Sequence, residues 1–417
     1  MNEITAIWAE WLRPSAGLPT VQWSLLLGIA AVAGHLVQRY LGLPKVVGYS
    51  ALGALAGLGG FSGAAWPLQG IGLFLLELGV AVVLFEAGGR IPLRWFRHNP
   101  MVLMQSLLES LLTLVIVYYV LRWLDVRPDV AESLAMVAMA ASPAVLSRIV
   151  IDTRASGPVT ERAMVLSTLS TLYALTLCTA RAGVMSRPHK DWGDMAYPIL
   201  VVLGLSVVVG AVLALALRVA LRVMSPTSEN TSILFMALLA AGTALASHFG
   251  GSAPLAALLG GMLLKQLNPK PWAWPRQLGT AGSLLTMLMF VLVSVVAANA
   301  QWNMQTARLV AALVAARAVA KVFGVSAANW GSGLSWRQAL YTSGAMLPMS
   351  SVALLLVSQF AASTPALPLI ARVALPAILL MEVVGAILAT LAVHRAGESS
   401  RSWGPDSGLT TPGEMRG

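Results

Sequence analysis

The residues that could do chemistry here are ionisable side chains inside long apolar runs of the chain. Glu109 lies in the run 101–122, and Arg317 and Lys321 lie in the run 306–327. An ionisable group inside a membrane-length apolar segment is costly and is by default a functional candidate. A carboxylate there could exchange a proton for a cation, which makes Glu109 a candidate coupling acid. Equally, Glu109 could pair with a basic residue such as Arg317.

Arg317 and Lys321 are four residues apart, so in a helix they share a face. Three roles are open for them. They could neutralise the carbonyl ends of broken helices, they could snorkel to the membrane interface, or they could act in transport by attracting an anion or carrying a proton. Glu382 stands in the middle of the last apolar run, 366–394, where it could pair with Lys321 or Arg372.

Two apolar runs carry a proline together with small hydroxyl residues near their middle, where the proline removes a backbone donor and breaks the helix. The run 131–150 contains Ser142 and Pro143, and the run 337–360 contains Pro348, Ser350 and Ser351. Unpaired backbone at that depth is tolerated only where it is buried in protein or lines a cavity. One proline alone could be a simple kink. The matched pair instead predicts two broken helices in inverted repeats, the arrangement that forms the binding site of many secondary transporters.

The composition places these residues in a membrane. The chain has 417 residues, of which 57% are hydrophobic and 11% are charged, against about 25% charged residues in an ordinary soluble domain. So few charges cannot cover the surface of a soluble protein, which disfavours a soluble enzyme, a disordered protein and a nucleic-acid binder. A helix needs about 20 apolar residues to cross the bilayer. The runs of this kind cover residues 22–39, 45–61, 68–88, 101–122, 131–150, 162–182, 196–222, 231–249, 253–267, 278–299, 306–327, 337–360 and 366–394. The sequence therefore predicts an all-α polytopic membrane protein with about 13 transmembrane helices.

The same runs predict how the chain is organised. The expected divisions are an N-terminal interfacial segment at 1–21, a transmembrane domain at 22–396 with repeats at about 22–182 and 231–394 around a linker helix at 196–222, and a disordered cytoplasmic tail at 397–417. The net charge is +10, and the basic residues fall mainly on one side of the alternating loops. Because Lys and Arg are retained on the cytoplasmic side, the N-terminus is expected outside and the C-terminus inside.

Four features occur in a characteristic order along the chain. They are Leu41–Tyr49 (LGLPKVVGY), Glu77–Phe85 (ELGVAVVLF), Ser252–Gly261 (SAPLAALLGG) and the basic pair Arg317 and Lys321. Together they resemble the monovalent cation/proton antiporter family, which includes bacterial sodium/proton exchangers and glutathione-gated potassium efflux systems. The resemblance implies an inner-membrane secondary transporter for protons and a monovalent cation, Na⁺ or K⁺. It also implies a scaffold, a moving core with crossed broken helices, elevator-type alternating access and a homodimer.

The chain departs from that family at a position that matters for coupling. The family carries an ion-binding carboxylate in its sixth span, and the matching stretch here, Val165–Tyr173, contains none. Ser170 and Thr171 stand nearest to its expected place. Hydroxyl groups could coordinate an alkali cation, although they supply no charge. They could instead bond back to their own helix or allow close helix packing.

Other chemistry finds no support in the sequence. The five histidines are too scattered for metal-ligand spacing, no phosphate-binding loop pattern occurs, and the single cysteine, Cys178, excludes an internal disulfide framework. Neither an enzyme activity nor a cofactor is expected. Three functions stay open: a cation/proton antiporter, a differently coupled or uncoupled carrier for another ion or small solute, and a non-transporting membrane module for interaction or sensing.

Overall fold

Each predicted apolar run forms a helix or a broken helix in the computed structural model. The structure describes residues 18–61, 70–91, 93, 96, 99–185, 192–225, 228–268, 276–300, 302–349, 351–361 and 367–400. The continuous helices are α2 (Leu18–Leu41), α3 (Lys45–Leu58), α4 (Gly70–Gly89), α6 (Pro100–Trp123), α9 (Pro158–Met185), α10 (Trp192–Val223), α11 (Glu229–His248), α12 (Ala253–Leu267), α13 (Arg276–Ala298), α14 (Met304–Ala327) and α17 (Leu367–Arg395). Among the described residues, eight helices are long and apolar enough to cross a membrane. The prediction of an all-α polytopic membrane protein is confirmed.

Both runs that carry a proline with small hydroxyl residues near the middle are broken, as predicted, whereas Pro198 and Pro376 lie inside the continuous helices α10 and α17. The first divides into α7 (Pro128–Met139) and α8 (Pro143–Thr153), and the second into α15 (Trp336–Ala345) and α16 (Ser351–Ala361). Pro143 stands in the first turn of α8, where its missing N–H costs nothing, and Val145 N donates to the Ser142 hydroxyl at 3.1 Å. Ser350 and the side chain of Ser351 lie outside the described residues, as do residues 1–17 of the expected interfacial segment.

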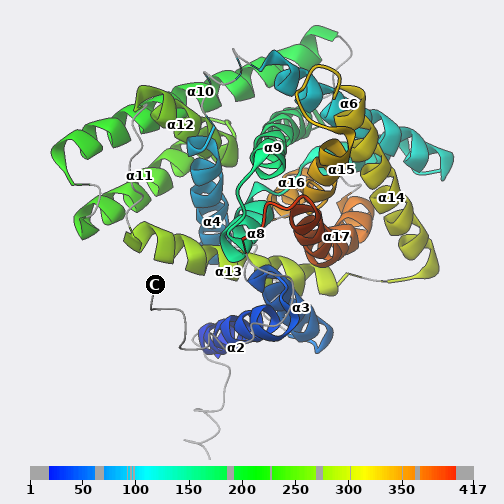
Figure 1. Cartoon of the computed structure of the whole chain (residues 1–417), viewed down its shortest axis with the longest axis horizontal. Coiled ribbons are helices and arrows are strands. Elements are labelled where there is room, and N and C mark those ends of the chain that lie inside the picture. Colours follow the sequence, from blue (N-terminus) through cyan, green and yellow to red (C-terminus); the bar gives the residue numbers. More distant parts are fainter. Residues whose placement is uncertain are drawn as a thin grey trace, which may run out of the picture.

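The helices form two bundles, which we call the crossing bundle (α6 to α9 with α14 to α17) and the flanking bundle (α2 to α4 with α10 to α13). Helices α8 and α9 belong to the crossing bundle and lie at the centre of the molecule, where the two bundles meet (Figure 1). The contacts follow a two-fold relation between α2–α9 and α11–α17. The packing of α3 on α13 has its counterpart in α12 on α4, and that of α6 on α7 has its counterpart in α14 on α15. The fold therefore contains the two repeats that the matched prolines predicted.

Glycines bring the helices of the flanking bundle into backbone contact, as small residues do in membrane proteins. Gly53 and Gly57 of α3 face α13, so that a Cβ at Gly53 would lie 2.9 Å from Ser294 Cβ and one at Gly57 would lie 2.9 Å from Ala298 Cβ. The two glycines stand one helical turn apart in an apolar run of the sequence, a spacing typical of close helix packing, and that packing is present here. On α12, a Cβ at Gly261 would lie 3.0 Å from Gly89 N of α4.

The first residues of the predicted tail contact the membrane domain. The Glu398 carboxylate accepts hydrogen bonds from the backbone N–H groups of Val159 and Thr160, each at 2.7 Å, in the first turn of α9. Ser399 forms an isolated bridge to Ala155. The segment 397–400 thus ties the end of α17 to the loop between α8 and α9, whereas residues 401–417 lie outside the described residues.

Replacing Glu398 by Ala is expected to lower the free energy of unfolding by about 1 kcal/mol, because two N–H groups of a helix N-terminus lose their acceptor. Thermal unfolding of the detergent-purified protein measures the change. The control Glu161→Ala removes an exposed carboxylate from the same helical turn without removing these two bonds. Equal melting temperatures for the two variants would contradict the capping role.

Candidate functional site

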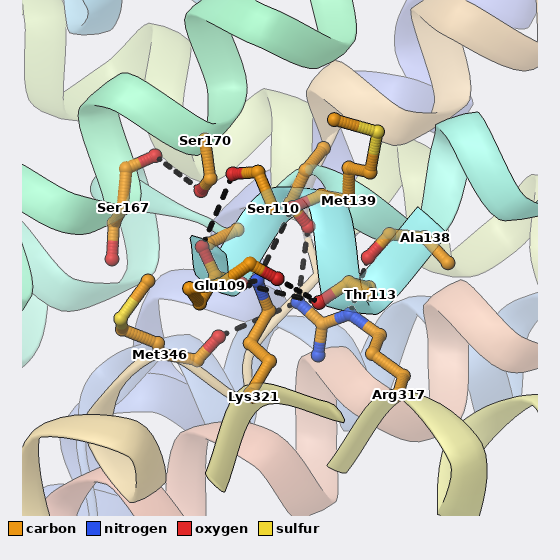
Figure 2. Close-up of polar contacts among 12 residues, drawn as sticks. Glu109, Ser110, Thr113, Ala138, Met139, Ser167, Ser170, Arg317, Lys321 and Met346 are labelled. Atoms are coloured by element: carbon orange, nitrogen blue, oxygen red, sulfur yellow. Dashed lines mark hydrogen bonds and ion pairs between the residues drawn. The ribbon is translucent and has the colours of Figure 1, made fainter. Parts of the chain in front are cut away.

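Arg317 joins the two broken helices at the centre of the crossing bundle. Its guanidinium donates to Ala138 O at 2.9 Å and to Ala140 O at 3.0 Å in the first break. It also donates to Leu347 O in the second break. The side chain is fully buried, with 0% of its surface exposed. Figure 2 shows it reaching from α14 toward Ala138 and Met346. A single side chain therefore bonds both breaks.

This arrangement follows from the electrostatics of helix ends. The last carbonyls of α7 and α15 have no partner within their own helices, and a helix C-terminus carries partial negative charge that a cation stabilises. The guanidinium has five donors in a planar fork and stays charged, so it can serve several carbonyls at once. Neutralisation of the broken helices was predicted chiefly for Lys321. The structure assigns most of this task to Arg317.

Lys321 lies one turn further along α14 and forms an ion pair with Glu109 of α6. Both side chains have 0% of their surface exposed, so neither Lys321 nor Arg317 snorkels to the interface. Lys321 Nζ also donates to Met139 O, at the end of α7, at 3.2 Å. The sequence had suggested Arg317 as a partner for Glu109. The structure instead pairs Glu109 with Lys321.

Two hydroxyl groups on α6 complete the surroundings of Glu109. Ser110 Oγ donates to Glu109 Oε2 at 3.2 Å, and Thr113 Oγ1 lies 3.3 Å from Glu109 Oε1 (Figure 2). Gly324 makes the approach of α14 possible, because a Cβ at Gly324 would lie 3.0 Å from Glu109 Cβ. The pair is therefore held by two helices in backbone contact, and its geometry is preorganised.

A second polar connection holds α6 and α14 together near the pair. The Gln105 amide donates to Val325 O at 2.7 Å, and Arg162 of α9 donates to Gln105 Oε1 at 3.2 Å and to Ser332 O at 2.8 Å. Only 6% of the surface of Arg162 is exposed. A polar residue such as Gln105 inside a span is the only signal that could have indicated this connection.

The hydroxyls predicted to line the pathway lie on α9 beside the first break. Thr171 Oγ1 lies 2.8 Å from Ala141 O and 2.8 Å from Ser167 O, so it bridges α9 to the break. Ser170 Oγ donates to Ser167 O of its own helix at 3.1 Å. Ser142, which caps α8, is also buried. The structure thus brings Ser142, Thr171 and Arg317 to the same break.

The fold and the sequence pattern point to one family. A family model described as the transmembrane part of sodium/hydrogen exchangers matches residues 26–397. This chain belongs to the sodium/hydrogen exchanger family. It is a transporter-family protein and not an enzyme, as predicted from the sequence.

Solved structures agree in fold with this exchanger-family chain. It superposes on a sodium/proton antiporter of Methanocaldococcus jannaschii, determined at pH 8, with a TM-score of 0.71 and 14% identity over 91% of this chain and 98% of the other. An electron-microscopy structure of the same antiporter gives a TM-score of 0.72 and 15% identity over 93% of this chain and 100% of the other. No curated protein sequence matches significantly.

Two cavities of the exchanger-family chain lie beside α8, and the larger one also borders the loop between α8 and α9. The larger one, of about 360 Å³, is lined by Arg90, Ser156, Glu161, Met164 and Val165 among others. The smaller one, of about 240 Å³, lies between α4, α8 and α13 and extends to Ala144, directly after the break at Pro143. Arg90 lines the larger cavity and Glu86 lines the smaller one. The two side chains form an ion pair, with 2.5 Å between Arg90 Nη2 and Glu86 Oε1.

Replacing Arg317 by Lys is expected to lower the free energy of unfolding by on the order of 3 kcal/mol, because an ammonium lacks the fork that bonds both breaks and each charge-assisted bond lost is worth about 1.5–3 kcal/mol. Thermal unfolding in detergent measures the loss. Arg308→Lys, at an exposed position on the same helix, is the matched control. Equal stability of the two variants would show that Arg317 does not hold the crossing.

Proposed function

We propose that this chain exchanges a monovalent cation, Na⁺ or K⁺, for protons across the membrane. The observation that carries the proposal is the fully buried ion pair of Glu109 and Lys321 beside the crossing of the two broken helices. Elevator-type movement of the crossing bundle against the flanking bundle would expose this site to each side in turn. The family and the antiporter fold support this class of transport.

The pair offers the chemistry that exchange requires. A cation that enters binds the Glu109 carboxylate and displaces Lys321, whose ammonium N–H bond breaks and whose proton leaves to water. One positive charge enters as another leaves, so the net charge of the site stays constant. This matters because an uncompensated charge in the interior of a membrane protein costs several kcal/mol. Glu109 would thereby replace the carboxylate that the family carries on α9.

Neutral oxygen atoms near the first break would complete the coordination of a dehydrated cation. Thr171 Oγ1 and Ala141 O lie 2.8 Å apart, and hydroxyl and carbonyl oxygens suit hard cations. The smaller cavity extends to Ala144, three residues from Ala141. We therefore expect the ion pathway to follow α8 and α9, with Ser142, Pro143, Ser170, Thr171 and Pro348 beside it. Ser350 and the side chain of Ser351, also expected there from the sequence, lie outside the described residues.

We further propose an N-terminus outside and a C-terminus inside a bacterial inner membrane, with two copies joined through the flanking bundle. The distribution of Lys and Arg supports this orientation. The two cavities would then open to the cytoplasm, because Ala155, which lines the larger one, is bridged to Ser399 near the C-terminus.

The orientation is tested by reporters fused after residue 417. A green fluorescent protein is expected to fluoresce, because it folds in the cytoplasm, whereas alkaline phosphatase is expected to be inactive there. A fusion within residues 124–127, between α6 and α7, is the matched control, since that loop is expected outside and should give the opposite result. Active phosphatase at the C-terminus would reverse the topology.

An anion or solute carrier is the alternative that the basic pair would favour if its charges were free. Arg317 is committed to the carbonyls of both breaks and Lys321 to Glu109. The positive charges are therefore already neutralised, and the geometry favours cation exchange. A non-transporting module has no comparable observation in its support.

Exchange is tested in liposomes with an internal pH dye, by addition of Na⁺, K⁺ or Li⁺ in turn. Glu109→Gln and Lys321→Ala are each expected to abolish cation-dependent proton flux. Because one unpaired buried charge destabilises the fold while removal of both is nearly neutral, the double variant Glu109→Gln/Lys321→Met is expected to fold and to be inactive. The exposed Glu229→Gln is the control and keeps full flux.

Each component of the proposal can fail separately in this assay. Flux that survives Glu109→Gln would exclude Glu109 as the coupling acid. Flux unaffected by Lys321→Ala would remove the lysine from the mechanism. No flux with any of the cations in the wild-type protein would favour the differently coupled carrier or the non-transporting module.

A further inference from the structure

A second buried carboxyl group lies where the two bundles meet. Glu382 stands near the middle of α17 in the crossing bundle and has 0% of its surface exposed. It accepts a hydrogen bond of 3.2 Å from Ser294 of α13 in the flanking bundle. Helix α17 also packs on α3, and in Figure 1 α13 runs between α17 and the pair α2 and α3.

Glu382 has no charged partner among the residues that the structure describes. Its Oε1 atom accepts no hydrogen bond there, and it forms no ion pair with Lys321 or Arg372, the partners that the sequence suggested. Arg317 contacts the neighbouring residue, with its Nη1 atom 3.9 Å from Met381 Sδ, and its guanidinium serves the carbonyls of the breaks. The other titratable side chains on the described parts of α17 and of the helices packed on it form no ion pair with Glu382 either: Lys45, Tyr49, Asp129, Glu132, Arg148, Asp152, Arg308, Lys321, Arg337, Tyr341, Arg372, His394 and Arg395.

The protonation state of Glu382 follows from this environment. A buried carboxylate without a compensating charge costs several kcal/mol, and such a group takes up a proton instead. This distinguishes Glu382 from Glu109, whose charge is matched by Lys321. On this argument we expect Glu382 to be neutral in this conformation and to hold a proton inside the membrane domain.

Hydroxyl groups from the flanking bundle face the same place. Ser294 lies against Gly53 of α3, whose Cβ would be 2.9 Å from Ser294 Cβ. Ser50 lies one turn before Gly53 on the same side of α3; it is fully buried, and its hydroxyl has no hydrogen-bond partner among the described residues. A carboxyl group and hydroxyl oxygens from three helices are the ligand types that a hard monovalent cation takes.

The position of Glu382 connects it with the pathway. One turn along α17, Gly385 packs on the second break, since its Cβ would lie 2.9 Å from Pro348 Cα. On α13, Thr286 lines the smaller cavity, and Ser294 lies two turns further along the same face, beyond the fully buried Phe290. The site is thus adjacent to the broken helices and in line with a cavity.

We propose that Glu382 and Ser294 form a second exchange site, at which a monovalent cation replaces the proton on the carboxyl group. The O–H bond of Glu382 breaks, the proton leaves to water, and the carboxylate binds the cation with Ser294 Oγ as a further ligand. The net charge of the site does not change, because one cation enters for each proton released. The inference rests on the proposed cation exchange for its ion class, but it concerns a different carboxyl group.

Proton release on cation binding tests both sites in the purified protein. The full chain is placed in weakly buffered detergent with a pH dye, and NaCl or KCl is added, with choline chloride as the control salt. The wild-type protein is expected to release about twice as many protons as Glu382→Gln, and about twice as many as Glu109→Gln, because each variant retains one of two sites. The double variant is expected to release none.

Two other carboxyl groups supply matched controls. Glu77→Gln removes a carboxyl group from α4, and Glu229→Gln removes an exposed one from α11; both are expected to release as many protons as the wild type. Ser294→Ala keeps the proton on Glu382 but removes one ligand of the cation. In this variant the release of the Glu382 proton is expected to require a higher cation concentration. This variant also tests the site if Glu382→Gln does not fold, as judged by gel filtration and thermal unfolding.

The two proposals fail in different ways. Release by Glu382→Gln that equals the wild type, or Ser294→Ala with an unchanged titration, would overturn the second site. Release by Glu109→Gln that equals the wild type would overturn the proposed exchange at the Glu109–Lys321 pair and leave the second site standing. No release from the wild-type protein with either salt would overturn both.

Discussion

The rest of the structure depends on the neutralisation of two helix C-termini, those of α7 and α15, inside the membrane domain. Breaking two helices at the crossing leaves backbone carbonyls that neither lipid nor water can satisfy. Arg317 bonds the carbonyls of both breaks with one guanidinium. With that charge in place, the breaks can remain open as irregular backbone, and α8 and α16 can present their N-terminal ends to the same central region. Without it, the cost of the unpaired carbonyls would favour continuous helices.

A buried cation of this kind constrains every other charge near it. Lys321, one turn away, adds a second positive charge, and Glu109 compensates it from a helix that Gly324 brings into backbone contact. On the proposed mechanism, charge changes at this place only by exchange of a cation for a proton, since any net change would leave an uncompensated charge in a low-dielectric interior. Glu382 forms no ion pair among the described residues, and we infer that it meets the same constraint by being neutral. The two acids would then represent two solutions to one electrostatic problem.

Much of the fold was accessible from the sequence because the bilayer sets simple rules. Span length is dictated by the thickness of the hydrocarbon core, so each of the apolar runs became a helix or a broken helix. Pro143 and Pro348 marked the breaks because each stands mid-run beside small hydroxyl residues, where proline removes a backbone donor; proline alone was no sufficient signal, since Pro198 and Pro376 lie within the continuous helices α10 and α17. The glycines at 53 and 57 marked close packing because they stand one turn apart in an apolar run. These signals are local, and local signals survive in any tertiary arrangement.

The pairing of the charges was decided by the tertiary structure. Spacing showed that Arg317 and Lys321 share a helical face, yet it could not show that the arginine meets the carbonyls and that the lysine meets Glu109, 212 residues earlier in the chain. It gave no reason to join Glu382 to Ser294 or Glu398 to the start of α9. Each of these contacts depends on the rotation and depth of one helix against another. Those quantities are set by the packing of the whole domain, and periodicity within a single helix carries no record of them.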